Sequence, residues 1–334
     1  MKKNIVVLRL DSETEERAYG IKQDLSYVAV YEKILQKNNI PYEIIRYGAE
    51  DFWKKALSAT HFIARFKGFE PDLSIGHAIL PLLEDAGVRC MPDYNSFQFC
   101  GDKLRLAAFY SAKNIPSPQT IPVFSSADVD RWKKEVGIYP VVGKLRKGAS
   151  SANVVLIQDA DQLDRISTRL FEHNMVDGQM DPSSRDQLVS AFKRRPVVTD
   201  QCLLLQEFAE GNDGDHRIIT IGRRAFYYRR SNRPNDFRAS GSGILSHEID
   251  RTDPELTQLA LALSQRFRFP MMVYDFLSKP RPMLTEMNYA TVGKYVSDCP
   301  GYFTPDGDFE PHDNRPPQWY QLADFLERPD LQIP

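Results

Sequence analysis

Three oxygen-bearing side chains stand in the second half of the sequence at spacings that suit a metal site. Asp275 lies in the apolar stretch Met-Val-Tyr-Asp-Phe-Leu, and Glu286 and Asn288 stand two residues apart in the next apolar stretch. Alternate residues of a strand point to one face of a sheet, and residues 278–281 are short enough for a hairpin. Two carboxylates and an amide oxygen on adjoining strands suit magnesium. Solvated acids at strand ends are the alternative, and three polar residues alone do not decide between the two.

A lysine before a turn of small residues indicates phosphate binding. Lys144 lies in a predicted strand that ends at residue 146, and residues 148–152 are Gly-Ala-Ser-Ser-Ala. Such a turn can fold its N–H groups over phosphates while the ammonium supplies charge. A Walker A loop is excluded, because Ile138 stands where its first glycine must be and Leu145 where it needs Ser or Thr. An ordinary hairpin turn with a solvated basic edge is the alternative.

Arginines gather downstream of a glycine-containing segment. Asp215 and Arg217 precede the apolar residues 218 and 219, and Arg230 and Arg238 follow. Arginines that converge on a cleft stabilise the charge that develops during phosphoryl or acyl transfer. Arginines on β-hairpins are otherwise most often surface residues, so this pattern also has an ordinary structural explanation.

The composition bounds the class of protein. The 334 residues hold 43 Lys+Arg and 45 Asp+Glu, so the formal net charge is 43 − 45 = −2, which predicts no nucleic-acid partner. A hydrophobic share of 42% and a charged share of 26% are typical of globular proteins. No apolar run approaches the roughly 18 residues that span a bilayer, so we expect no membrane partner. Four scattered cysteines without a CxxC pair predict a reducing, cytoplasmic setting.

The first 94 residues alternate predicted strands and helices, which indicates a small parallel sheet with flanking helices. Strands are expected over residues 5–10, 42–47 and 61–66, and helices over 26–38 and 75–86. Beyond them we expect helices over 102–113 and 255–267, and strands over 139–146, 153–158, 203–208, 216–221, 225–230, 271–277 and 282–289.

Two further segments differ from the rest of the chain in composition. Residues 160–200 predict two polar helices without the apolar stripe of a core helix, and a solvated outer face is the expected place for them. The last 34 residues are Pro-rich and predict one short amphipathic helix with Trp319, Leu322 and Phe325 on one face.

The order and type of these segments resemble the ATP-grasp superfamily, and within it the RimK-like branch of carboxylate–amine ligases. The resemblance runs from about residue 95 to 289, and its most specific element is Asp275 followed by Glu286-Met-Asn288. Its other pieces are Asn95, Asp102-Lys103, Pro140-Val-Val-Gly-Lys144, Leu205-Gln-Glu-Phe208, Asp215-His-Arg217 and Asp236-Phe-Arg238.

The resemblance implies an α/β (α+β) fold in which a small parallel α/β domain precedes a two-lobed ATP-grasp domain. Residues 1–94 would form the N-terminal domain and residues 95–205 the N-lobe with a phosphate-binding hairpin. Residues 206–300 would form the C-lobe with the metal site, and residues 301–334 a Pro-rich tail with a short helix.

The resemblance also assigns roles to residues. ATP phosphates would be bound by Lys103, Lys144 and a closing loop that contains Gly148, Ser150 and Ser151. Gln206, Glu207 and Phe208 would hold adenine, and Asp215 the ribose. Asp275, Glu286 and Asn288 would bind two Mg²⁺ ions, for which Mn²⁺ is a possible substitute. Arg217 and Lys144 would act in catalysis, and Arg230 and Arg238 would bind the substrate carboxylate. The loop has one glycine where relatives usually have two or more, and Gly143 replaces a more typical aliphatic residue.

The reaction implied is the ATP-dependent joining of a small-molecule or peptide carboxylate to an amine, with release of ADP and phosphate. Activation of the carboxylate as an acyl phosphate needs phosphate-binding groups, metal and a water-poor cleft, and no nucleophilic Ser or Cys. Two alternatives stay open: an ATP-grasp kinase that stops at a phosphorylated product, and a non-catalytic nucleotide-binding module. Relatives commonly form homodimers or tetramers, so a homo-oligomer is possible.

Overall fold

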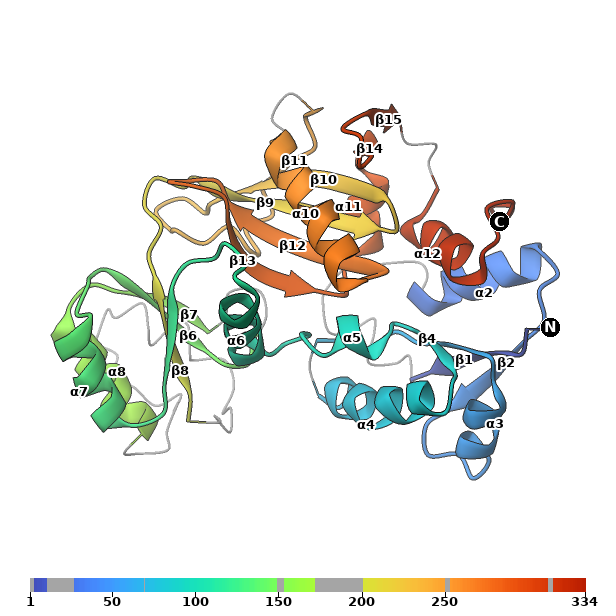
Figure 1. Ribbon diagram of the computed structural model, residues 1–334, viewed down its shortest axis with the longest axis horizontal. Coiled ribbons are helices and arrows are strands. Elements are labelled where there is room, and N and C mark those ends of the chain that lie inside the picture. The colour runs from blue at the N-terminus through green and yellow to red at the C-terminus, as the bar shows by residue number, and fades with distance from the viewer. Residues whose placement is uncertain are drawn as a thin grey trace.

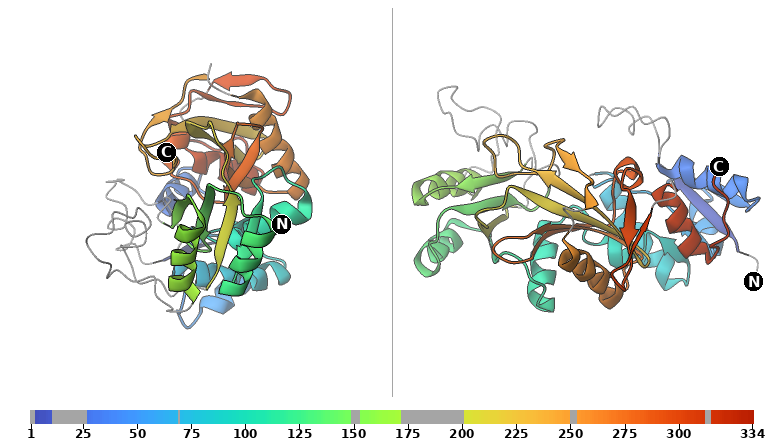
Figure 2. Two further views of the ribbon diagram at one scale, coloured as in Figure 1. Left: turned by 90° about the vertical axis from the view of Figure 1, so that its left-hand side faces the viewer. Right: turned by 90° about the horizontal axis from the view of Figure 1, so that it is seen from above.

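Three β-sheets follow one another along the long axis of the molecule (Figures 1 and 2). The structure is a computed structural model that describes residues 3–10, 27–68, 70–148, 153–171, 201–249, 253–311 and 315–334. The mixture of one parallel and two antiparallel sheets with packed helices confirms the predicted fold class. The division of the chain at residues 94, 205 and 300 stays a prediction.

The first sheet is the parallel sheet expected from the alternating pattern. Its strand order is β2-β1-β3-β4, with β1 in the interior. Four of the five residues of β1 are buried, because helices cover both faces of such a sheet. The third strand is shorter than predicted and ends before Arg65. The elements are β1 (Ile5–Arg9), α2 (Tyr27–Lys37), β2 (Tyr42–Arg46), α3 (Phe52–Ser58), β3 (His61–Ile63), α4 (Asp72–Asp85), β4 (Arg89–Met91) and α5 (Tyr94–Phe97).

The second sheet has the order β5-β8-β6-β7 and is antiparallel. Its apolar face packs against α7 and α8, at the left in Figure 1. The expectation for residues 160–200 is wrong for its first helix, since Leu163, Ile166 and Leu170 of α8 are buried in this core. Residues 172–200 lie outside the described part. The elements are α6 (Lys103–Lys113), β5 (Thr120–Val123), α7 (Ser126–Glu135), β6 (Val141–Leu145), β7 (Val154–Ile157), α8 (Ala160–Phe171) and β8 (Leu203–Glu207).

The third sheet has the order β13-β12-β9-β10-β14-β15, and β11 pairs with β10. One face packs against α6 and α10, and part of the other packs against α2 and α12. The remainder of that second face carries the charged residues described below. The elements are β9 (Gly214–Ile221), β10 (Arg224–Ser231), β11 (Leu245–Ser246), α10 (Pro254–Phe267), β12 (Met271–Leu277) and β13 (Met283–Asn288).

The last part of the chain contributes more than the single helix expected. The predicted helix forms as α12 (Pro317–Leu326), and Trp319, Leu322 and Phe325 are buried on it. Two short strands extend the third sheet beyond β10. Among the helices of the described residues, none has the length and apolar character needed to cross a bilayer. The additional elements are α11 (Gly293–Ser297), β14 (Gly301–Phe303) and β15 (Phe309–Pro311).

Candidate active site

Four neighbouring strands place the predicted acids and arginines on one face of the third sheet. Asp275 of β12 lies opposite Glu286 of β13 on one side and opposite Arg217 of β9 on the other. Arg230 of β10 lies opposite Asp215 of β9. Directly opposite residues of an antiparallel pair share a face. The hairpin predicted between Asp275 and Glu286 therefore brings the two carboxylates together.

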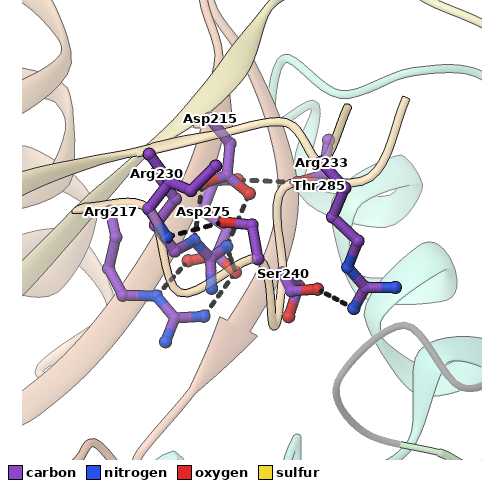
Figure 3. A network of polar contacts seen from close by, with 9 residues as sticks. Asp215, Arg217, Arg230, Arg233, Ser240, Asp275 and Thr285 are labelled. Atoms are coloured by element: carbon purple, nitrogen blue, oxygen red, sulfur yellow. Dashed lines mark hydrogen bonds and ion pairs between the residues drawn. The ribbon is translucent and has the colours of Figure 1, made fainter. Parts of the chain in front are cut away.

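Two arginines and two aspartates form a buried ion network on this face (Figure 3). Arg217 donates from Nε and Nη2 to the two oxygens of Asp275, at 2.6 and 2.7 Å. Arg230 donates to both oxygens of Asp215, at 2.6 and 2.5 Å, and also to Oδ2 of Asp275 at 2.6 Å. Asp275 is 3% exposed and Arg230 is 5% exposed. Burial acts to raise the pKa of Asp275, but the two guanidinium groups outweigh it and hold this pKa at about 2.

The network gives Arg230 protein partners. Its guanidinium pairs with Asp215 and Asp275, and its role in binding a substrate carboxylate stays a prediction. Arg238 also has protein partners, because it donates to both oxygens of Asp236 and to the main-chain oxygen of Val154 at 3.1 Å. That last contact joins the loop after β10 to the hairpin of the second sheet.

Both predicted phosphate-binding lysines line the same cleft, Lys144 from the second sheet and Lys103 from the start of α6. Lys144 of β6 points to the face that also bears Gln206, which is the face away from α7 and α8. Lys103 begins α6 and donates to the main-chain oxygen of Gly148 at 2.7 Å. Burial lowers the pKa of Lys144 to about 8, and it also lowers the pKa of Lys103, while Glu286 acts in the opposite direction on both. Two desolvated ammonium groups facing a carboxylate suit a polyphosphate with its metal.

Most of the predicted site residues line one cleft between the second and third sheets. Arg217 and Asn288 do not line it, although they lie on the same sheet face as Asp275. Ser150 and Ser151 lie outside the described residues. The predicted residues that line the cleft are Lys103, Lys144, Gly148, Gln206, Glu207, Phe208, Asp215, Arg230, Arg238, Asp275 and Glu286.

The segment predicted to hold adenine forms the end of β8 and the residue after it. The Glu207 main-chain N–H donates to the Gln119 oxygen at 2.8 Å, and the Gln206 side chain donates to Thr120 at 2.8 Å. The N–H of Glu207 is therefore used within the sheet, and binding of adenine by this segment stays a prediction. Phe208 continues the cleft wall and packs edge-to-face on Phe237, with ring centroids 5.9 Å apart.

The proposed metal ligands fit magnesium in donor chemistry. The described residues contain no cluster of three or more His, Cys, Asp or Glu side chains that could hold an ion. A bound ion would therefore depend on the two carboxylates together with the amide oxygen of Asn288. That oxygen accepts from the Ala290 N–H at 3.1 Å, and Asp275 is held by both arginines. Glu286 and Asp275 both line the cleft, and Glu286 carries no arginine partner among the ion pairs of the described residues.

The pairing of Arg230 with Asp215 was not anticipated from the sequence. Each residue was recognised, but each was given a separate role. The signal was present, because the short turn at Gly222-Arg223 fixes the register of the β9–β10 hairpin. Counting back from that turn places residues 215 and 230 opposite each other. Thr285, whose hydroxyl donates to the Asp275 main-chain oxygen at 2.9 Å, was also missed.

Comparisons with known proteins agree with this geometry. No family model matches the chain. It is 23% identical over 216 residues to a probable alpha-L-glutamate ligase of Cellvibrio japonicus, covering 64% of this chain but only 63% of that protein, which is less than two thirds. It is 24% identical over 250 residues to the glutamate–LysW ligase ArgX of Sulfurisphaera tokodaii, covering 73% of this chain and 78% of that protein. The crystal structure of a RimK domain ATP-grasp protein from Sphaerobacter thermophilus is 15% identical, with a TM-score of 0.54 over 97% of this chain and 99% of that one.

The fold is similar to that of a solved ATP-grasp protein. The relatives in sequence and in structure point to the RimK-like branch, so the resemblance seen in the motifs is confirmed. Both curated relatives are named as ligases, which agrees with the predicted class, an ATP-dependent carboxylate–amine ligase.

Proposed function

We propose that this chain is an ATP-dependent ligase that joins a carboxylate to an amine. The observation that carries the proposal is the cleft in which Lys103 and Lys144 from one side face Asp275 and Glu286 from the other. ATP would supply the γ-phosphoryl group that turns the carboxylate into an acyl phosphate, and attack by the amine would then give an amide, ADP and phosphate.

The residues of the chain have definable tasks in such a reaction. Lys103 and Lys144 would bind the phosphates with charge that water does not screen. Glu286, Asp275 and Asn288 would hold magnesium, which neutralises charge on the phosphates. Arg217 is held by the Asp275 carboxylate, and a fixed guanidinium can stabilise developing negative charge without reorganisation. Gln206, Glu207 and Phe208 would hold the adenine ring, and Asp215 the ribose.

The names of the two curated relatives have glutamate in common. We therefore propose an acidic amino acid, or a peptide that contains one, as one of the two substrates. A cytoplasmic setting and assembly into a homo-oligomer belong to the same proposal. The setting is supported by four cysteines that are all buried thiols.

Product analysis tests the reaction. Purified protein is incubated with ATP, magnesium and a matrix of carboxylates and amines, and products are followed by phosphorus NMR. We expect ADP and phosphate only when both substrates are present, and a hydroxamate when hydroxylamine replaces the amine. A stable phosphorylated product formed without an amine would indicate a kinase. AMP with pyrophosphate, or no ADP from any pair, would refute the ligase proposal.

A further inference from the structure

A second cavity lies between the first and third sheets, apart from the cleft. Its volume is about 500 Å³, which is within the range of small-molecule sites. None of the residues that line the cleft also lines this cavity. Arg65, Tyr289 and Tyr31 form part of its wall, together with Met271 at the start of β12.

Arg65 stands where an open parallel sheet offers a ligand crevice. The strand order β2-β1-β3-β4 places β2 and β3 on opposite sides of β1, so the chain reverses direction across the sheet between β1 and β3. Ligands bind outside the carboxyl ends of the strands at such a reversal. Arg65 is the second residue after β3 and lies at this edge.

The Arg65 guanidinium has partners that leave its charge uncompensated. Its Nη2 donates to the Thr291 main-chain oxygen at 2.7 Å, and its carbon atom lies 4.3 Å from the centre of the Tyr27 ring. In the described part of the chain, none of the ion pairs includes Arg65. Burial raises the pKa of Tyr27 to about 12 and raises that of Tyr31 as well, so these phenols are neutral at physiological pH. A guanidinium that is partly removed from water and lacks an anion is suited to bind one.

The cavity adjoins the reaction centre through β13. Tyr289 lines the cavity, directly follows Asn288 and stands three residues after Glu286. At about 3.3 Å per residue, the cavity wall is roughly 10 Å from the proposed metal position. The Tyr289 hydroxyl accepts from the Phe66 N–H at 2.8 Å and also donates to the Phe66 oxygen. Because Phe66 directly follows Arg65, these bonds fix the position of Arg65 relative to the reaction centre.

The cavity wall also carries carboxyl groups. Glu84 at the end of α4 and Asp93 before α5 both line it. The Glu84 carboxylate already accepts from the Tyr94 N–H at 2.7 Å, which holds it in place. Arg89 and Asp324 also line the cavity, but Arg89 is paired with Glu327 and Asp324 with Arg224. The guanidinium of Arg65 and the carboxyl groups of Glu84 and Asp93 then match a ligand that carries both an anion and an ammonium group.

We propose that this cavity binds the acidic amino-acid portion of the substrate, with Arg65 holding the carboxylate that is not activated. The inference rests on the proposed function, because that function places ATP phosphates with Lys103 and Lys144 and the reacting carboxylate at Glu286. The anion at Arg65 is then a second carboxylate of the same substrate. Glu84 and Asp93 receive its ammonium group.

Ligand pairs that differ only by amidation test the proposal. The full chain is saturated with a non-hydrolysable ATP analogue and magnesium, and L-glutamate, L-glutamine, L-aspartate and L-asparagine are titrated by calorimetry. We expect one of the acids to bind at least about tenfold more tightly than its amide, because a bidentate charged contact is lost in the amide. Arg65→Met should reduce the affinity for the acid to that for the amide and leave the affinity for the ATP analogue unchanged.

Arg89→Met is the matched control. Arg89 lines the same cavity, but its guanidinium is paired with Glu327 at 2.7 Å, so the discrimination should persist in this variant. If Arg65→Met does not fold, Arg65→Lys can be used, because lysine keeps the charge but cannot form the bidentate contact of a guanidinium. It should bind the acid several-fold more weakly than wild type and the amide with unchanged affinity. Equal discrimination in wild type and the Arg65 variants would overturn the proposal, as would failure of wild type to bind either acid.

The two proposals fail in different ways. If the acid binds in an Arg65-dependent way but neither ADP nor hydroxamate forms, the ligase proposal is refuted and the cavity is still a binding site for the acid. If Arg65→Met forms hydroxamate at the wild-type rate, the cavity does not bind the substrate, and the ligase proposal still stands.

Discussion

Asp275 combines a structural and a proposed catalytic task in one carboxylate. It neutralises Arg217 and Arg230 and is also expected to bind an ion. Glu286 lies opposite it on β13 and lines the cleft, and its proposed role is metal binding alone. The two acids therefore differ in what their loss should do.

Asp275→Asn should reduce both activity and stability, whereas Glu286→Ala should abolish turnover and leave the fold intact. Removing one partner of a buried ion network leaves uncompensated charge, which costs about 3–5 kcal/mol. Urea unfolding should show this loss for Asp275→Asn and a change within about 1 kcal/mol for Glu286→Ala. Equal unfolding free energies for the two variants would contradict the network, and turnover in Glu286→Ala would contradict the metal assignment.

The lowered pKa of Lys144 predicts a pH dependence of ATP binding. Burial brings this pKa from 10.5 to about 8, so the ammonium loses its proton as pH rises through 8. ATP affinity should fall several-fold between pH 7 and 9, and AMP affinity should change little because it lacks the outer phosphates. The unfolded chain retains this proton up to about pH 10.5, so this group should make the free energy of unfolding rise between pH 8 and 10.5.

Calorimetric titrations of ATP and AMP at several pH values provide the measurement. Lys144→Arg stays protonated throughout and should flatten the ATP profile. A wild-type profile that resembles that of Lys144→Arg would show that Lys144 does not titrate at the phosphates.

At the scale of elements, the sequence predicted most of what forms the cleft. The longer strands and helices have clear apolar patterns, and β9, β10, β12 and β13 lie within a few residues of their expected bounds. The three-residue strands β4, β14 and β15 were not predicted, because so few residues show no period. Arg65 was missed for a different reason, since only the strand order shows that it stands at the reversal of the sheet.

Helix α8 provides a test of the corrected interpretation of residues 160–171. Leu163 is fully buried under the sheet that carries Lys144, so Leu163→Ala should cost about 2–5 kcal/mol. Arg165 is exposed on the same helix, and Arg165→Ala should change the unfolding free energy by less than about 0.5 kcal/mol. Denaturant unfolding of both variants gives the comparison. If both substitutions change the unfolding free energy by equally small amounts, the first interpretation, a solvated helix, would be correct.

At the scale of the whole molecule, one hydrophobic core joins segments from both ends of the chain. Ile5 and Val7 of β1 pack in the same cluster as Ile219 of β9 and Leu322 of α12. The helices α2 and α12 lie side by side at the right of Figure 1, and the Tyr31 hydroxyl donates to the Gln321 side chain at 2.5 Å. This core fixes the edge that bears Arg65 relative to the sheet that bears Glu286.

The shared core predicts that the first and third sheets unfold together. Leu322 is 0% exposed, so Leu322→Ala should cost about 2–5 kcal/mol. Because its side chain supports both sheets, hydrogen exchange of the globally protected amides in β1 and β9 should accelerate by the same factor. Ile333→Ala is the control, since Ile333 is 41% exposed and should leave exchange unchanged. Faster exchange in β9 with unchanged exchange in β1 would show two independent units, and the fixed distance between Arg65 and the reaction centre would then lose its structural basis.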